Sequence, residues 1–273
     1  MMAVEASAGD DRDLGRTLRW GRVIGLPVAA GAMPMVSQEI VRLARGDRGG
    51  HVCVANVHMV VTARRDPHLR AVMESAAVVV SDGMPLVWRL RRAGFPEAEQ
   101  VRGPDLTLEL GRRAAAEGLP VYFYGGEPAL IATILERLRA ELPDLIVAGA
   151  EAPPMLPARP AADPRTVERI RGSGARIVFV GLGCPKQEFW MQAYRPHLAA
   201  VLLGVGQAFA IAAGQVREAP AWMRRRGLEW LDRLAIEPRR LWRRYLVTNS
   251  LFIVYVVRET LAGTFRRRDP DSA

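Results

Sequence analysis

The first residue whose type and position could do chemistry is Asp82, which follows the apolar run 76–80. This run is rich in β-branched residues and ends abruptly, so it predicts a short buried strand. Gly83 comes next, and Pro85 suits the first turn of a helix. Ligands of open α/β sheets bind beyond the carboxyl ends of the strands, where a carboxylate could take a proton from a substrate. Asp82 could instead only cap the helix or stiffen the turn, as most such aspartates do.

Two glycine-rich turns also follow apolar runs. The first, Gly-Leu-Gly-Cys-Pro-Lys-Gln-Glu at 181–188, contains Gly183 and Gln187, and the second ends at Gly206. Glycines that open a helix let backbone amides approach a phosphate, and the amide of Gln187 could contact a base or a sugar. The dinucleotide fingerprint GxGxxG is incomplete, because Lys186 replaces its third glycine and no acidic partner follows. Tight turns with close strand–helix packing are the alternative interpretation.

A phosphate needs a positive neighbour, and Arg102 is one candidate. It precedes Gly-Pro-Asp105 at a predicted helix start, where Asp105 would complement the helix dipole. The Arg102 side chain could bind a phosphate or lie on an ordinary surface. Metal-dependent nucleotide-sugar enzymes use an Asp-x-Asp triplet at a strand end, but here such triplets occur only at 11–13 and 269–271, in the tails. We therefore predict no metal and no cofactor.

More arginines lie near the C-terminus, at positions that could form one face. Arg233, Arg240 and Arg244 are spaced by seven and four residues, which brings them together on a continuous helix. Such a face could close over a diphosphate or rest on an anionic membrane, although most basic faces are simply solvated. Tryptophans at positions 222, 230 and 242 favour a membrane interface, where indole rings accumulate.

The segments that would position these residues alternate along the chain. Apolar runs predict strands at 22–30, 51–55, 76–81, 120–124, 145–149, 175–181 and 199–204. Helical patterns lie between them at 35–45, 58–75, 85–93, 103–117, 128–142, 166–172 and 187–194. Strands that alternate with helices predict an α/β fold, with a Rossmann-like, mostly parallel sheet and helices on both faces.

The character of the sequence changes near position 219. Beyond it the patterns are only helical, and arginines and aromatic residues mix throughout. We predict a flexible leader at 1–19, a catalytic α/β domain at 20–218, a helical membrane-associating appendage at 219–263 and a charged tail at 264–273.

Composition limits the class of partner. The 273 residues are 49% hydrophobic, enough for a sizeable core, and the net charge is +9. This charge favours an anionic partner, whether nucleic acid, phosphorylated substrate or acidic lipid. Nearly all the cations are arginines, which genomic base composition could explain, so their positions carry more weight than their number.

The cysteines and the apolar runs bear on the compartment. Cys53 and Cys184 lie far apart and fit neither a zinc site nor a disulfide framework, so a reducing compartment is expected. The N-terminal segment lacks the apolar stretch of a signal peptide. No run reaches the roughly 18 apolar residues that a membrane-spanning helix needs.

These motifs together resemble the WecG/TagA/CpsF family of bacterial glycosyltransferases. The resemblance runs from about Ile24 to Leu261. It rests on Ala-Asn at 55–56, Asp-Gly-Met-Pro at 82–85, Arg-Gly-Pro-Asp-Leu at 102–106, the glycine turn at 181–188, and a long signature from 219 to 245.

The resemblance implies an inverting, metal-independent transfer of a sugar, an N-acetylhexosamine or a related hexose. The donor would be a UDP-sugar and the acceptor a polyprenyl-diphosphate-linked sugar at the cytoplasmic membrane face, in cell-surface polysaccharide or teichoic-acid-type synthesis. Asp82 matches the family's proposed catalytic base. Val54 departs from the family pattern, which often has threonine there, so a hydroxyl contact to the substrate is missing. The sequence is compatible with a homo-oligomer.

The same resemblance assigns the pocket residues Asn56 and Gln187, and the cations that face the diphosphate, Arg233, Arg240 and Arg243 or Arg244. Our full set of predicted substrate-binding residues is Asn56, Gly83, Arg102, Gly183, Gln187, Gly206, Arg233, Arg240, Arg243 and Arg244.

Two other functions would use some of the same features. A Rossmann-type nucleotide-binding oxidoreductase would share the strand–glycine–helix turns, but it predicts a complete glycine fingerprint, which the chain lacks. A nucleic-acid-binding protein would share the positive charge, but its basic residues should lie in a motif that reads a groove. Here the clearest basic cluster lies in a tryptophan-rich helical segment, so we predict no nucleic-acid partner.

Overall fold

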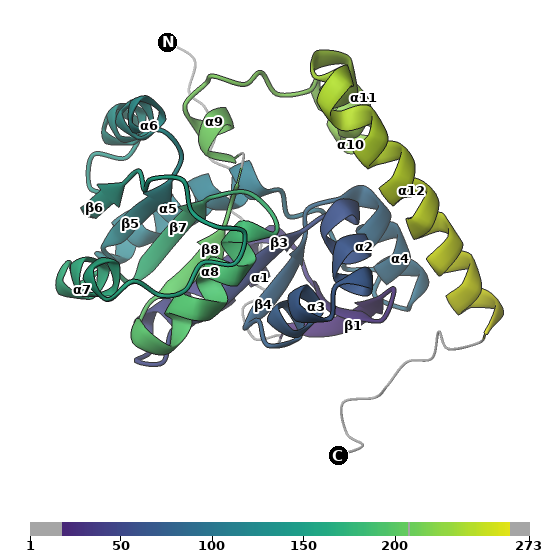
Figure 1. Cartoon of the computed structure of the whole chain (residues 1–273), viewed down its shortest axis with the longest axis horizontal. Helices are drawn as coiled ribbons and strands as arrows, with labels where there is room; N and C mark the ends of the chain where they lie inside the picture. Colours follow the sequence, from purple (N-terminus) through teal and green to yellow (C-terminus); the bar gives the residue numbers. More distant parts are fainter. Residues whose placement is uncertain (1–17, 207, 263–273) are drawn as a thin grey trace, which may run out of the picture.

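The core of the protein is a six-stranded sheet in the order β4-β3-β8-β7-β5-β6 (Figure 1). The structure is a computed structural model that describes residues 18–206 and 208–262, apart from the side chains of Arg225 and Arg240. The strands are β3 (Gly50–Ala55), β4 (Val78–Ser81), β5 (Val121–Gly125), β6 (Val147–Glu151), β7 (Ile177–Gly181) and β8 (Val201–Gly204). All neighbouring strands run parallel, so their carboxyl ends lie at one edge. The predicted α/β class is confirmed.

Helices cover both faces of the sheet, and each face has its own apolar core. One face is covered by α2 (Val57–Arg65), α3 (Pro67–Glu74), α4 (Met84–Arg92), α7 (Pro164–Gly172) and α8 (Lys186–Tyr194). The other is covered by α1 (Met33–Arg45), α5 (Gly103–Glu117), α6 (Pro128–Glu141) and α9 (Ala208–Ala212). Burial on both faces explains why most of the strand sequences are largely apolar rather than alternating, whereas the edge strand β6 is only partly buried.

The crevice for a ligand follows from the order of the strands. The central strands β3 and β8 are neighbours, but the chain after β3 enters α2 on one face, whereas the chain after β8 enters α9 on the other. Connections that diverge in this way open a crevice at the carboxyl ends of the two strands, where ligands of open α/β sheets bind.

Two local expectations were wrong. The predicted strand 22–30 is an antiparallel hairpin of β1 (Arg19–Val23) and β2 (Leu26–Ala30), separate from the main sheet. Ile24 and the glycine after it both have positive φ, as a two-residue hairpin turn requires. The predicted helix 58–75 is divided into α2 and α3 at Asp66, whose side chain caps α3.

After α9 the chain forms three helices that we call the appendage: α10 (Ala221–Arg225), α11 (Glu229–Ile236) and α12 (Pro238–Leu261). In Figure 1, α12 runs along one side of the molecule next to α2, and the two helices are in contact. An ion pair of 3.1 Å between Arg89 of α4 and Glu259 joins α12 to the α/β domain. No helix in the described ranges is both long and apolar enough to cross a bilayer. The predicted leader, except for its last two residues, and the predicted charged tail lie outside the described residues.

Candidate active site

The appendage closes the crevice at the carboxyl ends of β3, β4 and β8 into a cavity of about 1100 Å³. Its walls come from the turns after these strands and after β7, and from α4, α11 and α12. A smaller cavity of about 660 Å³ lies at the opposite edge of the sheet, around Gly49 and Ala77, away from the turns that the sequence singles out. The larger cavity is therefore the candidate active site.

Asp82 lies at the end of β4 and lines this cavity. It does not cap the helix that follows, because Gly83 is the N-cap of α4. Its Oδ1 instead accepts a hydrogen bond of 3.0 Å from the backbone N–H of Gly103, at the start of α5. Burial raises the pKa of the Asp82 carboxyl group, the Gly103 hydrogen bond opposes this, and the Glu229 carboxylate raises the pKa further. A carboxylate with a raised pKa is better suited to accept a proton.

Asn56 and Gly83 lie side by side in the turns after β3 and β4. Asn56 is the N-cap of α2, where its Oδ1 accepts a hydrogen bond from the N–H of Met59. A side chain added to Gly83 would lie 3.7 Å from Asn56. Both residues line the cavity.

The turns after β7 and β8 meet at Gln187. Its Oε1 accepts a hydrogen bond of 3.1 Å from the N–H of Gly183, which has a positive φ of 79°. A side chain at Gly206 would lie 3.2 Å from the same oxygen. All three residues line the cavity, and the side chain of Gln187 is buried apart from 3% of its surface.

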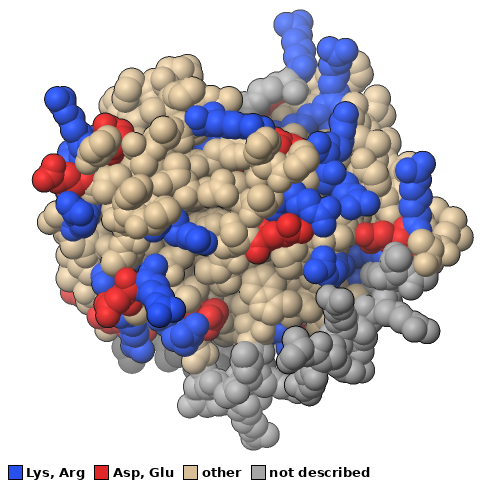
Figure 2. Space-filling view, turned by 60° about the horizontal axis from the view of Figure 1, so that its bottom comes forward, with Lys and Arg blue, Asp and Glu red and all other residues tan. Residues whose placement is uncertain are grey.

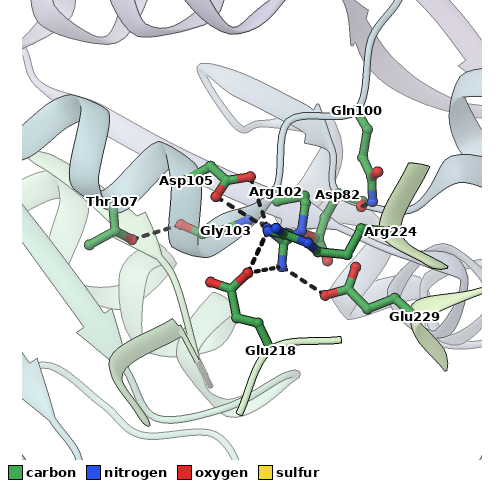
Figure 3. Close-up of polar contacts among 9 residues, drawn as sticks. All are labelled: Asp82, Gln100, Arg102, Gly103, Asp105, Thr107, Glu218, Arg224 and Glu229. Carbon is green, nitrogen blue, oxygen red and sulfur yellow. Dashed lines mark hydrogen bonds and ion pairs between the residues drawn. The ribbon is translucent and has the colours of Figure 1, made fainter. Parts of the chain in front are cut away.

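Arg102 joins the α/β domain to the appendage (Figure 3). It is the N-cap residue of α5 and is only 6% exposed. Its guanidinium group lies 3.0 Å from a carboxylate oxygen of Asp105, 3.3 Å from Glu218 and 2.9 Å from Glu229. Glu218 also pairs with Arg224 of α10. The guanidinium group of Arg102 is therefore engaged by acidic side chains, and the residue itself does not line the cavity, although Gly103 does.

The C-terminal arginines divide into two groups. Arg233 and Arg244 line the cavity. Arg243 is exposed, and its guanidinium group lies 5.8 Å from the centre of the Trp242 ring. Arg240 belongs to α12, but its side chain lies outside the described part. In Figure 2, many basic side chains and few acidic ones lie on the right, the side that α4 and α12 occupy in Figure 1.

Sequence reasoning missed several polar residues of the cavity, among them His58 and Glu229. Burial and the nearby charge of Arg244 lower the pKa of His58 to about 4, so its ring is neutral at neutral pH. His58 is in the first turn of α2, two residues after Asn56, and that proximity was a usable signal. Glu229 gave no such signal, because its place depends on how the appendage docks.

Comparison with known proteins identifies the family of this chain. A model of the glycosyl transferase WecG/TagA/CpsF family matches residues 21–266. The chain belongs to the WecG/TagA/CpsF family. It is therefore a glycosyltransferase of cell-surface polysaccharide synthesis, which uses a sugar donor and an acceptor. The match to this family includes the appendage as well as the α/β domain, and it favours a transferase over the oxidoreductase and nucleic-acid-binding alternatives.

Membership of the WecG/TagA/CpsF family gives the cavity a chemical context. A sugar transferase has to hold an activated donor, remove a proton from an acceptor hydroxyl and stabilise a leaving group. The residues that line the cavity include the carboxyl groups of Asp82 and Glu229, amide side chains such as those of Asn56 and Gln187, glycine turns and several guanidinium groups. Groups of these types are the ones that the three tasks require.

Proposed function

We propose that the protein is an inverting, metal-independent glycosyltransferase that moves an N-acetylhexosamine or a related hexose. The donor is a UDP-sugar, and the acceptor is a polyprenyl-diphosphate-linked sugar in cell-surface polysaccharide or teichoic-acid-type synthesis. One observation carries the proposal: Asp82 of the α/β domain and Arg233 and Arg244 of the appendage line the same cavity.

The chemistry assigns a role to each side of the cavity. The oxygen of an acceptor hydroxyl forms a bond to the anomeric carbon while the bond from that carbon to the diphosphate breaks, and attack from the opposite face inverts the configuration. Asp82 takes the hydroxyl proton, a contribution of roughly 10²–10⁴ in rate. UDP leaves with additional negative charge, which the guanidinium groups of Arg233 and Arg244 stabilise by charge-assisted hydrogen bonds.

The glycine turns and amides hold the donor. The glycines Gly83, Gly183 and Gly206 let the backbone approach the nucleotide closely, and Asn56 and Gln187 offer amide groups for the sugar or the base. Arg102 would contact the diphosphate only by exchanging one of its carboxylate partners for it.

The appendage also supports a peripheral position on the inner face of the cell membrane. Several apolar side chains of α12 face outward, with Leu246 62% exposed, Val257 49% exposed and Leu261 83% exposed. Trp222 and Trp242 are about half exposed. Apolar and indole groups beside basic residues suit an anionic lipid surface, where Arg243 would meet headgroups. A lipid-linked acceptor would then enter the cavity from the membrane side.

The test is a product analysis with the full chain on anionic phospholipid vesicles. A panel of UDP-sugars is offered with a polyprenyl-diphosphate-linked sugar, with and without EDTA, and products are identified by mass spectrometry. We expect one UDP-sugar to give an acceptor extended by one sugar and free UDP, at a rate that EDTA leaves unchanged. Failure of every UDP-sugar, or complete inhibition by EDTA, would contradict the proposal.

A further inference from the structure

Glu188, in the first turn of α8, is buried in an unusual setting. Its side chain is 0% exposed, although carboxyl groups are rarely buried without a cationic partner. In the described part of the chain, its Oε2 atom has no hydrogen-bond partner. No basic side chain contributes to the shift in the pKa of its carboxyl group. A buried carboxyl group of this kind requires an explanation.

The other oxygen of Glu188 contacts a residue of the cavity. Oε1 accepts a hydrogen bond of 2.8 Å from Nε2 of Gln187, whose own Oε1 accepts from the N–H of Gly183. If the Gln187 amide were turned over, its NH₂ group would face the N–H of Gly183 and its oxygen would face the Glu188 oxygen. Both contacts would then be repulsive while Glu188 is ionised. The two hydrogen bonds therefore select one orientation of the amide.

The backbone around Gln187 leaves little room for another arrangement. A side chain at Gly204 would lie 2.9 Å from Nε2 of Gln187, and one at Gly206 would lie 3.2 Å from Oε1. The amide is thus enclosed by the turns after β7 and β8 and by Glu188, and its remaining hydrogen-bonding capacity is available to the cavity that it lines.

We propose that Glu188 is a positioning residue that fixes the Gln187 amide for binding of the sugar nucleotide, and that ionisation of Glu188 weakens this binding because it adds a negative charge next to the nucleotide. The proposal rests on the proposed function, because it concerns how the donor is held. It adds a residue that does not touch the substrate but acts through one that does.

The surroundings of Glu188 support this dependence on ionisation. Burial raises the pKa of Glu188 to about 7, while hydrogen bonds from Gln187 and Cys184 oppose the increase. The titratable neighbours are the thiols of Cys53 and Cys184, and burial raises the pKa of both well above the ordinary value, so they stay neutral. An ionised Glu188 therefore adds an uncompensated negative charge next to Gln187, and so close to the bound nucleotide. Binding of a diphosphate should weaken as the pH rises through about 7.

Two variants distinguish the effect of the hydrogen bond to Gln187 from the effect of the negative charge on Glu188. Glu188→Gln keeps an acceptor oxygen but cannot ionise, whereas Glu188→Leu removes the acceptor. Glu168→Gln, at an exposed position of α7, is the matched control. The measurements are KM, kcat and the binding of UDP-N-acetylglucosamine by calorimetry, at about pH 6 and about pH 8.

We expect Glu188→Leu to raise KM by about tenfold with a smaller change in kcat, which corresponds to one lost hydrogen bond. Glu188→Gln should keep the wild-type affinity at the lower pH and lose the weakening at the higher pH. Unchanged KM in Glu188→Leu, or the same pH dependence in Glu188→Gln as in the wild type, would overturn the proposal.

A spectroscopic measurement gives an answer without turnover, and it remains available if Glu188→Leu does not fold. In protein labelled with ¹⁵N-glutamine, the side-chain NH₂ signals of Gln187, assigned with Gln187→Leu, should titrate with a midpoint of about 7. Glu188→Gln should abolish that titration. Signals of Gln187 that do not respond to pH would refute the positioning role. A protein that transfers no sugar from any UDP-sugar but shows this titration would instead refute the proposed function.

Discussion

Asp82 illustrates how the cavity changes the chemistry of a single residue. Burial raises the pKa of its carboxyl group above the ordinary value of 3.8. A general base must be ionised to accept a proton, so activity should be lost as the pH falls through this raised pKa. We expect the acid limb of kcat/KM to lie above 3.8, and a pH series of single-turnover rates measures it. An acid limb with an apparent pKa at or below 3.8 would show that a group other than Asp82 limits the rate.

Glu188 predicts a pH dependence of stability. Its pKa is about 7 in the folded protein and 4.5 ordinarily, so the folded state binds the proton more tightly than the unfolded state. The free energy of unfolding should therefore fall as the pH rises from 4.5 to about 7 and then level off. Since a tenfold change in proton affinity corresponds to about 1.4 kcal/mol, the loss should be about 3 kcal/mol. Urea unfolding of Glu188→Gln should lack this loss, whereas Glu168→Gln should retain it. If both variants lost the same free energy of unfolding, the loss would come from titratable groups other than Glu188.

The sequence was informative for residues at strand ends and uninformative for residues placed by docking. Asp82 and the glycine turn that contains Gln187 were predicted to bind a ligand because each follows a predicted strand, whereas Asn56 was assigned to the pocket only by the family resemblance. Glu229 was not predicted, because it reaches Arg102 across 127 positions of the chain, and no local pattern records such a contact. The engagement of Arg102 by carboxylates was missed for the same reason.

At the scale of elements, the acidic side chains around Arg102 dock the appendage. Removing the charged partners of a buried cation costs about 3–5 kcal/mol, and less here because Asp105 remains. We expect the double variant Glu218→Gln, Glu229→Gln to loosen the appendage. Limited proteolysis should cut faster between residues 213 and 220, and kcat/KM should fall by about tenfold or more.

The control for this experiment is Glu39→Gln, which removes an exposed ion pair with Arg42 on α1. Exposed pairs contribute roughly 0–1 kcal/mol, so this variant should behave as the wild type. If the double variant also kept the wild-type cleavage pattern and rate, the Arg102 contacts would not hold the appendage.

The boundaries of the helices and strands show where the local sequence pattern was sufficient to predict the structure. Apolar runs located the six strands of the main sheet, because burial on both faces leaves a continuous apolar signal. The hairpin of β1 and β2 was missed because Ile24 occupies a positive-φ turn position that normally takes glycine, asparagine or aspartate. At Asp66 the capping signal and Pro67 were both visible in the sequence, but the predicted helix 58–75 ran through both positions.

At the scale of the whole molecule, the outward side of α12 should bind anionic membranes. Leu246→Glu and Val257→Glu place charges on that side, so both should reduce cosedimentation with anionic phospholipid vesicles by about tenfold. Ile146→Glu is a matched control, since Ile146 is 48% exposed on the α/β domain. If cosedimentation fell equally in all three variants, or in none of them, α12 would not be the membrane-binding surface.

The central claim is that Asp82 accepts the proton while guanidinium groups of the appendage stabilise the leaving diphosphate in the same cavity. Asp82→Asn tests it most directly, because asparagine can still accept the hydrogen bond from Gly103 but is no longer a base. We measure the single-turnover rate of sugar transfer together with the Kd for the UDP-sugar. The rate should fall by roughly 10²–10⁴, with Kd changed by less than about threefold. Transfer at the wild-type rate by Asp82→Asn would contradict the account.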